Sequence, residues 1–445
     1  MRKTMLCITA VTVCVFFSFI PARAEDAPGN PVLQIGLDEA IKRALAASEE
    51  LKIKDSEVAK TRGKYREERS ALLPQVTAQS TWTRNMAYPD TAEKTDYELS
   101  SGISASQVLW SFGRVMYAVS SAGRAVEASR FNREAGRQDI IYTAKLCYYS
   151  SLLSKNSLSI TEKSYANALE NKSLMGQRSN GGRSSRYEIV RMNAEVAARV
   201  PTVNEARTQF DSAAEALKKL IDADPGCTIS LTGNFRDNYD EFSYDKLVAA
   251  LYKQEPTLKS LEKSIEAADA KLKSRYAGFL PTVSAFTSWN YNGGSNEDES
   301  VNRSNLDRYS FAGVKVSIPV WEGGEKEALL SQSKADKEIA VLKSRQTEKA
   351  FLLELKKAFL EYEQYKDNLK ANIEAVDLSE ESFKQTQEMF ASGQVTLTDL
   401  NDAELLLTNQ RLNKEMTLFN INITQAKIEK LIAGQYDEQA DEKKS

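Results

Sequence analysis

The sequence predicts an α+β fold that is mainly α-helical, in which long helices form an elongated body and four β-strands lie at one end. One basis for this prediction is an internal duplication, because Leu73-Pro74-Gln75-Val76 recurs as Leu280-Pro281-Thr282-Val283. Further along the chain, Trp110-Ser111-Phe112-Gly113 recurs as Trp321-Glu322-Gly323-Gly324. The duplicated unit is too long for an ordinary solenoid period, so each copy is expected to be one large supersecondary assembly.

The other basis is a change of hydrophobic period inside each copy, from helical to alternating. The alternating segments cover about residues 75–85 and 97–110 in the first copy and 282–291 and 309–321 in the second. Each is about ten residues long, which suits a tilted strand that crosses a bilayer. One set of alternating positions is small and polar and predicts a wet face: Thr77, Gln79, Ser100, Ser104, Ser284 and Ser288.

Residues 1–24 have the pattern of a secretory signal peptide. Arg2 and Lys3 precede an apolar stretch from Leu6 to Ile20, and Ala22-Arg23-Ala24 supplies the small residues of a cleavage site. The apolar stretch is short for a membrane span, so we expect removal of the peptide and a mature chain outside the cytoplasm. After Ala24, the sequence has no run of eighteen apolar residues.

The remaining segments are predicted to be long helices, which complete a first repeat over residues 37–223 and a second over 244–433. Their expected ranges are Leu37–Leu72, Arg114–Arg178 and Arg183–Ala223, then Lys246–Phe279, Glu325–Ala391 and Leu397–Ala433. Apolar residues at helical spacing, such as Leu352, Leu355 and Phe359, indicate coiled-coil packing between the helices. Residues 434–445 are expected to be a disordered charged tail.

The composition argues against several functions. A formal net charge of −3 gives no basic surface for nucleic acid, so no nucleic-acid partner is expected. The chain contains no histidine, and Cys147 and Cys227 lie far apart, so no catalytic residue, metal site or cofactor is predicted. The two cysteines form either one bridge or two isolated thiols.

Four strands per chain raise a problem of closure. Unpaired backbone groups at a sheet edge cost several kcal/mol each in hydrocarbon, and four strands cannot close on themselves. Two, three or four chains would supply eight, twelve or sixteen strands, and twelve should enclose an aqueous bore. The four tryptophans are expected at strand ends, where they would form a membrane-interface aromatic belt: Trp82, Trp110, Trp289 and Trp321.

The repeated motifs, in this order, resemble those of TolC-type outer membrane efflux proteins over the whole mature chain. The resemblance implies a homotrimer with a 12-stranded transmembrane β-barrel, four strands per chain, continued by a long α-helical barrel in the periplasm of a Gram-negative bacterium. It implies a passive exit duct of a tripartite efflux pump or type I secretion system, which catalyses no reaction. The expected partners are outer membrane lipid, a periplasmic adaptor and an inner membrane transporter of the RND, ABC or MFS type.

The resemblance also implies roles for the turns between helices. The periplasmic tips would contact the adaptor through Gly181, Gly182, Arg183, Gly393, Gln394 and Val395. Asp399 and Asp402 match the family's closure ring, and their i, i+3 spacing places both carboxylates on one helix face. The duplication places Glu188 and Arg191 at the corresponding positions of the first repeat.

Two alternatives bear on these predictions. Thr398-Asp399 also suits an ordinary helix start, in which the residues cap the helix and face its positive end. Phe390 and Val395 stand where family members close with tyrosine and arginine, which puts that bridging pattern in doubt here. The alternative to a duct is a secreted or periplasmic coiled-coil protein with a structural or adhesive role.

Overall fold

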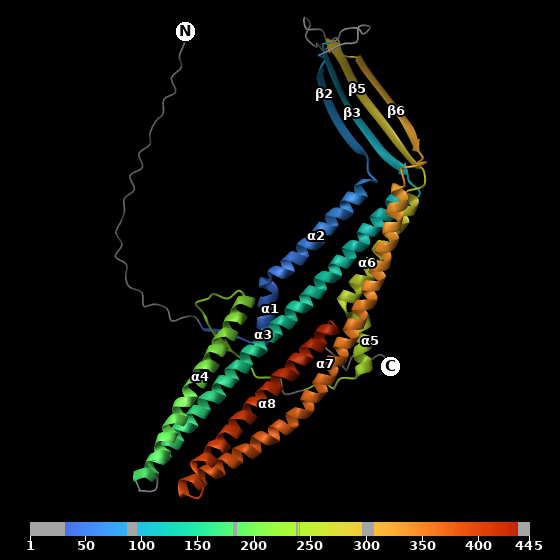
Figure 1. Cartoon of the computed structure of the whole chain (residues 1–445). Coiled ribbons are helices and arrows are strands. Elements are labelled where there is room, and N and C mark those ends of the chain that lie inside the picture. The colour runs from blue at the N-terminus through green and yellow to red at the C-terminus, as the bar shows by residue number, and fades with distance from the viewer. Residues whose placement is uncertain are drawn as a thin grey trace, which may run out of the picture.

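A computed structural model describes residues 32–86, 96–180, 185–236, 239, 241–295 and 307–434. The predicted signal peptide, residues 435–445 of the predicted tail, and Gly181, Gly182 and Arg183 lie outside the described residues. The molecule is elongated, with a β-sheet at one end and paired helix ends at the other (Figure 1). No described helix has an apolar stretch long enough to cross a membrane.

The four predicted alternating segments form one antiparallel sheet. Its strands are β2 (Gln75–Arg84), β3 (Tyr97–Trp110), β5 (Thr282–Ser295) and β6 (Asp307–Ser317), in the order β2-β3-β5-β6. The two repeats therefore join through β3 and β5. Among the strands that the structure describes, β2 and β6 lie at the two edges of this sheet.

The strand register separates apolar from polar side chains. One rung pairs Ala78, Ile103 and Trp289 in succession, and the next pairs Thr77, Ser104 and Ser288. The apolar face carries Val76, Ala78, Trp82, Leu99, Ile103, Ala105, Val283, Ala285, Trp289, Ala312, Val314 and Val316. The polar face carries Thr77, Gln79, Ser100, Ser104, Ser106, Ser284, Ser288 and Asn290, together with an aromatic group of Phe286, Tyr309 and Phe311.

Two of the four tryptophans do not lie at strand ends, and that expectation was wrong for them. Trp82 and Trp110 lie at or near the ends of β2 and β3. Trp289 lies well inside β5, because the strand continues to Ser295 by pairing with the first part of β3. Trp321 lies beyond the end of β6, in the connection to the next helix, and is 82% exposed.

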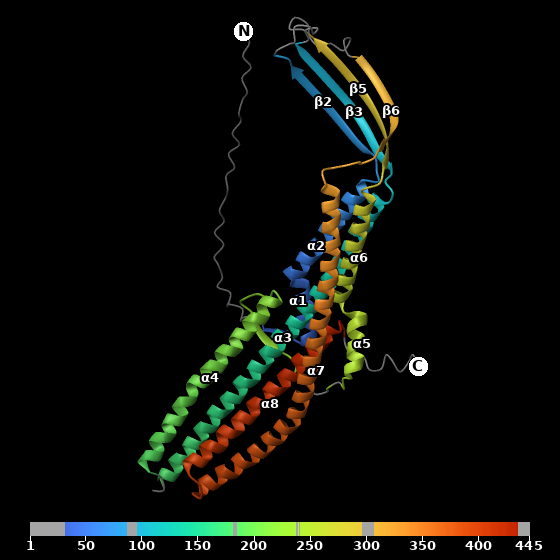
Figure 2. The same ribbon diagram turned by 45° about the vertical axis from the view of Figure 1, so that its right-hand side comes forward.

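Each repeat is built around one helix of nearly seventy residues. These are α3 (Arg114–Asn180) and α7 (Glu325–Ser392), as Figure 2 shows from a second side. Shorter helices lie beside them: α1 (Leu37–Ala47), α2 (Glu49–Ser70) and α4 (Arg186–Leu220) in the first repeat, and α5 (Tyr244–Gln254), α6 (Pro256–Ala277) and α8 (Leu397–Leu431) in the second.

The two helices predicted as continuous over Leu37–Leu72 and Lys246–Phe279 are each broken once. At the first break, the Ser48 hydroxyl accepts a hydrogen bond from the Leu51 N–H (3.2 Å) and starts α2. At the second, the Glu255 carboxylate accepts from the Leu258 N–H (3.0 Å), and Pro256 occupies the first helical position. A side-chain cap therefore begins a new helix at equivalent places in the two repeats.

A short parallel sheet, absent from the prediction, joins the starts of the two repeats. It pairs β1 (Val32–Ile35) with β4 (Thr228–Leu231). Ile35, Ile229 and Leu231 are buried with Leu152 of α3 in one hydrophobic cluster. This small sheet packs against the middle of the helical body.

The passage from strand to helix uses left-handed backbone conformations in both repeats. Phe112 and Gly113 have φ values of 50° and 88°, and Gly323 and Gly324 have values of 64° and 85°. Glycine adopts this region without the steric cost of a Cβ, which explains why the Gly-containing motif recurs after β3 and β6. The two turns direct α3 and α7 away from the sheet.

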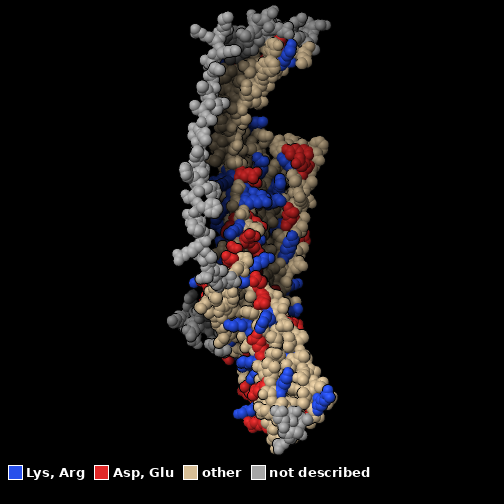
Figure 3. All heavy atoms as spheres, turned by 90° about the vertical axis from the view of Figure 1, so that its left-hand side faces the viewer, with Lys and Arg blue, Asp and Glu red and all other residues tan. Residues whose placement is uncertain are grey.

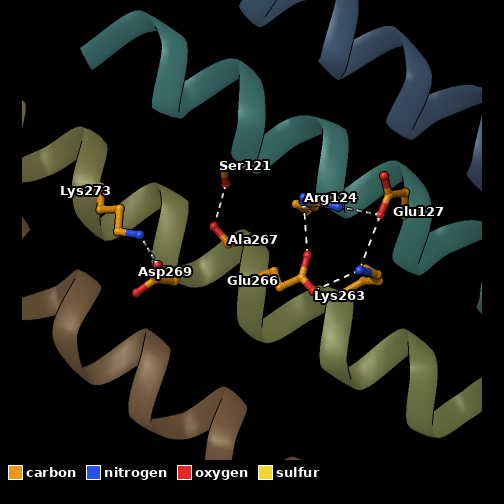
Figure 4. Close-up of polar contacts among 8 residues, drawn as sticks. All are labelled: Ser121, Arg124, Glu127, Lys263, Glu266, Ala267, Asp269 and Lys273. Carbon is orange, nitrogen blue, oxygen red and sulfur yellow. Dashed lines mark hydrogen bonds and ion pairs between the residues drawn. The ribbon is translucent and has the colours of Figure 1, made fainter. Parts of the chain in front are cut away.

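Charged side chains gather over the helices, whereas the part of the sheet that is visible above them is mostly without charged residues (Figure 3). Figure 4 shows one such region, where α3 packs against α6. Arg124 pairs with Glu266 (3.0 Å) and Glu127 (3.0 Å), and Lys263 pairs with Glu266 (2.8 Å). The Ser121 hydroxyl also donates to the Ala267 carbonyl oxygen (2.7 Å), which brings the two helices close together.

Candidate functional site at the helical tips

Four helices from both repeats share one apolar core at the end of the molecule opposite the sheet. Its buried members are Met175 of α3, Met192 of α4, Phe383 and Phe390 of α7, and Leu397, Leu400 and Leu407 of α8. Burial of each large apolar side chain contributes about 1.5–3 kcal/mol. The core therefore holds the α3/α4 and α7/α8 hairpins together at their tips, which lie side by side in Figures 1 and 2.

Gly393 makes the turn between α7 and α8. It has φ 84° and ψ 18°, and its N–H donates to the Met389 and Phe390 carbonyl oxygens. The next N–H, of Gln394, also donates to the Met389 carbonyl (2.9 Å). Val395 then packs partly buried against the tip core. These bonds satisfy the last carbonyl groups of α7 and fix the direction in which the chain returns.

Gly393→Ala is expected to lower the free energy of unfolding by about 1–2 kcal/mol, because a Cβ is unfavourable in the left-handed region. The matched control is Gly176→Ala in the interior of α3, where an added Cβ would have no neighbour within 4 Å. There alanine should stabilise the helix by about 0.5–1 kcal/mol. Urea titration followed by circular dichroism measures both changes, and equal effects would refute a conformational role for Gly393.

Asp399 and Glu188 occupy equivalent helix-capping positions. The Asp399 carboxylate accepts from the Thr396 N–H (2.8 Å) and hydroxyl (2.7 Å), and the Thr396 hydroxyl accepts from the Asp399 N–H (3.3 Å). Ser185 and Glu188 make the same reciprocal pair at the start of α4. Thr396 is therefore the N-cap of α8, and the expectation that Thr398 would be was wrong. The pattern Ser/Thr-x-x-Asp/Glu was visible in the sequence.

The capping bonds keep Asp399 ionised. Hydrogen bonds from the Thr396 side chain and then its backbone lower the pKa of Asp399 below its usual value. A group with a lowered pKa in the folded protein contributes stability above its unfolded pKa and loses it as the pH falls through the folded value. The cap therefore weakens only when the pH falls through the lowered pKa of Asp399.

Asp402 and Arg191 lie one helical turn further from the caps. Asp402 is exposed on the same side of α8 as Asp399, while Leu400 and Glu404 between and beyond them are buried. Arg191 is partly exposed on α4. Within the described residues, the structure shows no ion pair that joins Arg191 to Glu188 or Asp399. In one protomer, the described contacts therefore include no ion pair among Arg191, Glu188, Asp399 and Asp402, which all lie at the end of the molecule opposite the sheet.

Phe390 and Val395, which stand where family members close with tyrosine and arginine, belong to the apolar core at the tips. Phe390 is 1% exposed, and Val395 packs against the same cluster.

Polar bonds between the hairpins lie further from the tips. Gln387 of α7 donates to Asn171 of α3 (3.3 Å), and both side chains are at least partly buried.

One buried polar contact between the hairpins involves two residues, Arg199 and Glu404, that were not predicted from the sequence. Arg199 of α4 pairs with Glu404 of α8 (2.5 Å) and donates to the Ser164 hydroxyl of α3 (2.7 Å). The Glu404 side chain is 1% exposed and also accepts from Thr408 (3.0 Å). The sequence contained one indication of this contact. The carboxylate of Glu404 lies on the same face of α8 as the apolar residues Leu400 and Leu407.

The sequence left open whether the two cysteines form a disulfide bond, and the structure shows that they do not. Cys147 and Cys227 are separate thiols. Burial raises the pKa of Cys147, which favours its neutral form.

The comparisons decide the family. The model of the family described as outer membrane efflux protein matches residues 40–223 and 247–434, which are both repeats. The chain belongs to the outer membrane efflux protein family. It is an outer membrane protein of the Gram-negative type, and its helices extend into the periplasm. Members of the family are channel proteins, and the alternative of a secreted structural or adhesive protein is set aside.

Individual relatives are distant in sequence. Outer membrane efflux protein BepC of Brucella suis is 22% identical over 64% of this chain, and the match spans 59% of BepC. Outer membrane protein TolC of Vibrio cholerae is 23% identical over 78% of each chain. The crystal structure of CusC has a TM-score of 0.78 and 17% identity, and covers 94% of this chain and 96% of that one. This similarity shows that the fold is shared.

Proposed function

We propose that three copies of this chain assemble into a passive exit duct for a tripartite efflux pump or type I secretion system. The observation that carries the proposal is a sheet with one apolar face and two open edges, β2 and β6, on a long helical body. Open edges are costly in hydrocarbon, so β6 of each copy pairs with β2 of the next and closes twelve strands. The apolar face contacts lipid, and the polar face lines the bore.

The helices of the three copies continue the bore through the periplasm. An adaptor docks on the tips, around Gly393, Gln394 and Val395 and around Gly181, Gly182 and Arg183. An inner membrane transporter of the RND, ABC or MFS type supplies the energy. A passive duct catalyses no reaction, so its cargo passes through chemically unchanged. That cargo is a small molecule or a polypeptide.

Asp399 and Asp402 form the narrow end of the duct in this proposal, with Glu188 and Arg191 beside them. Threefold symmetry brings six carboxylates around the axis, where they attract cations. Asp399 also caps α8, so its charge is held by the same bonds that start the helix. Asp402 has no such structural role among the contacts described, and its replacement is therefore the cleaner test.

Asp402→Asn is expected to weaken divalent-cation block of the channel by about tenfold, because it removes three charges from the ring. Single-channel conductance in planar bilayers, with and without Mg²⁺, measures the block. Glu50→Gln, which removes an exposed carboxylate from the first turn of α2, is the control and should leave the block unchanged. Equal block in Asp402→Asn and the unmodified protein would contradict the aperture, and absence of any channel would contradict the duct.

A further inference from the structure

The polar face of the sheet carries one group of aromatic side chains on β5 and β6, called the wall patch here: Phe286, Tyr309 and Phe311. The rest of this face consists mainly of serine, threonine, asparagine and glutamine. Tyr309 and Phe311 are each 49% exposed, although large aromatic rings gain stability from burial. Exposed apolar side chains that are grouped, rather than scattered singly, are typical of a binding surface.

The rings of the wall patch offer faces in two orientations. Tyr309 and Phe311 are stacked, with ring centres 6.3 Å apart and an angle of 12° between their planes. The ring of Phe286 meets that of Phe311 at 70°, with centres 6.0 Å apart. All three residues belong to one chain, so the patch does not depend on how neighbouring copies pair. A flat ligand could lie on one ring face and touch the next ring at its edge.

Two of the rings are held in place by their neighbours. Gly313 lies opposite Phe286 in register, and a Cβ there would lie 3.0 Å from Phe286 Cζ. The absence of a side chain at Gly313 therefore lets this ring lie against β6. The Tyr309 hydroxyl accepts a hydrogen bond from the Asn292 amide (3.2 Å), and Asn292 Oδ1 accepts from the Ser100 hydroxyl (2.9 Å). Rings that are positioned before a ligand arrives lower the entropy cost of binding it.

Charge is distributed unevenly along the wall patch. Asp307 is exposed on the polar face two residues before Tyr309, about 7 Å along the strand. Among the described residues, Asp307 has no ion pair, and its neighbour Arg308 lies on the opposite face. Glu98, the other described carboxylate of the polar face, also lies at the loop end of the sheet. The cation of this face, Lys315, is eight residues from Asp307, roughly 27 Å away.

These features together select one kind of ligand. A ring face attracts a cation through the negative charge above its plane. A flat apolar group on the ligand gains contact area by stacking on Tyr309 and Phe311. A neutral ring would gain only the stacking, and an anion would be repelled by Asp307. The ligand that satisfies both the rings and the carboxylate is a planar aromatic cation, with its charge toward the loop end.

We propose that the wall patch, together with Asp307, binds planar aromatic cations as they pass through the barrel. The proposal rests on the proposed function, in which the polar face lines the bore, and it names one class of small-molecule cargo. A trimer has three such sites, and each is complete within one copy. Binding is expected to be weak, because a ligand held tightly could not leave the duct.

Fluorescence anisotropy of ethidium, a planar aromatic cation, tests the site when it is titrated with the protein in lipid nanodiscs. Lipid then covers the outer face of the barrel, and the bore stays open to water. Tyr309→Leu with Phe311→Leu should bind ethidium at least about tenfold more weakly than the unmodified protein, because both ring faces are lost. Asp307→Asn should bind about threefold more weakly and lose most of the salt dependence.

The matched control is Tyr291→Leu, which removes a ring from the apolar face of β5 and should leave the affinity unchanged. Fluorescein, a planar aromatic anion, should bind the unmodified protein weakly. If the double variant does not assemble, Tyr309→Leu and Phe311→Leu are measured singly, and each should lose part of the affinity.

Three results would overturn the site. One is equal ethidium binding by trimers of the unmodified protein and the double variant, and another is equal binding of ethidium and fluorescein. The third is a loss in Tyr291→Leu as large as that in the double variant. Chemical cross-linking of the same samples counts the copies. A trimer in which the variants bind alike refutes the wall patch alone, whereas absence of a trimer in the unmodified protein refutes the proposed function.

Discussion

Arg199→Ala is expected to lower the free energy of unfolding by about 3–5 kcal/mol per protomer, the largest loss predicted for a single side chain here. The change leaves the Glu404 carboxylate buried without its cation, 2.5 Å from where the guanidinium was. A buried charge without a partner is far more costly than the lost attraction alone. Urea titration of the detergent-solubilised protein, followed by helical circular dichroism, measures the loss.

Two controls separate burial from charge. Arg207→Ala removes another arginine of α4, whose partner Glu162 lies 3.1 Å away with both side chains largely exposed. Exposed pairs contribute about 0–1 kcal/mol, so this variant should resemble the unmodified protein. Arg199→Met combined with Glu404→Leu should recover most of the stability, because no charge is then buried alone. Equal losses in Arg199→Ala and Arg207→Ala would contradict the account of this contact.

Ile103→Arg is expected to destabilise the membrane-inserted state by about 2–4 kcal/mol per protomer and so to deplete the outer membrane of assembled channel. Ile103 lies in the middle of β3 on the apolar face, paired with Ala78 and Trp289. An arginine there would face hydrocarbon at a depth from which it cannot easily reach water. Quantification of heat-modifiable oligomer in outer membrane fractions measures the effect.

The adjacent residue provides the control. Ser104→Arg places the same side chain one position along the strand, on the polar face next to Thr77 and Ser288. Since the polar face lines water in the proposed barrel, assembly should persist and only conductance should change. Loss of assembly in Ser104→Arg alone would mean that the two faces have been assigned the wrong way round, and equal loss in both variants would contradict a water-lined polar face.

Periodicity predicted the main elements because they depend on local sequence. Strands β2 and β3 and helices α3 and α7 follow from alternation or from long apolar seams, which short windows reveal. The motif around Gly113 and Gly324 identified the strand-to-helix passages, because only a residue without Cβ enters that backbone region freely.

What local sequence could not predict depends on distant partners. β1 and β4 have four residues each and pair in parallel, so neither forms without the other. The length of β5, and so the interior position of Trp289, depends on pairing with β3 of the other repeat. Glu404 reads as a surface acid until α4 brings Arg199 against it. In each case, the feature is determined by contacts between the two repeats, which a short sequence window does not contain.

The central claim is that open edges β2 and β6 pair between three copies. Within one chain these strands are separated by β3 and β5, about 14 Å apart at the usual strand spacing, whereas a disulfide needs Cα atoms within about 7 Å. Ala78→Cys on β2, combined in turn with Ser310→Cys, Ala312→Cys or Val314→Cys on β6, can therefore form a disulfide only between copies.

Non-reducing electrophoresis of these variants after oxidation in the membrane is the most direct measurement. A closed ring predicts that at least one combination yields a ladder of monomer, dimer and trimer that stops at trimer and collapses on reduction. No linked species in any combination, a ladder that stops at dimer, or one that extends beyond trimer would contradict the account.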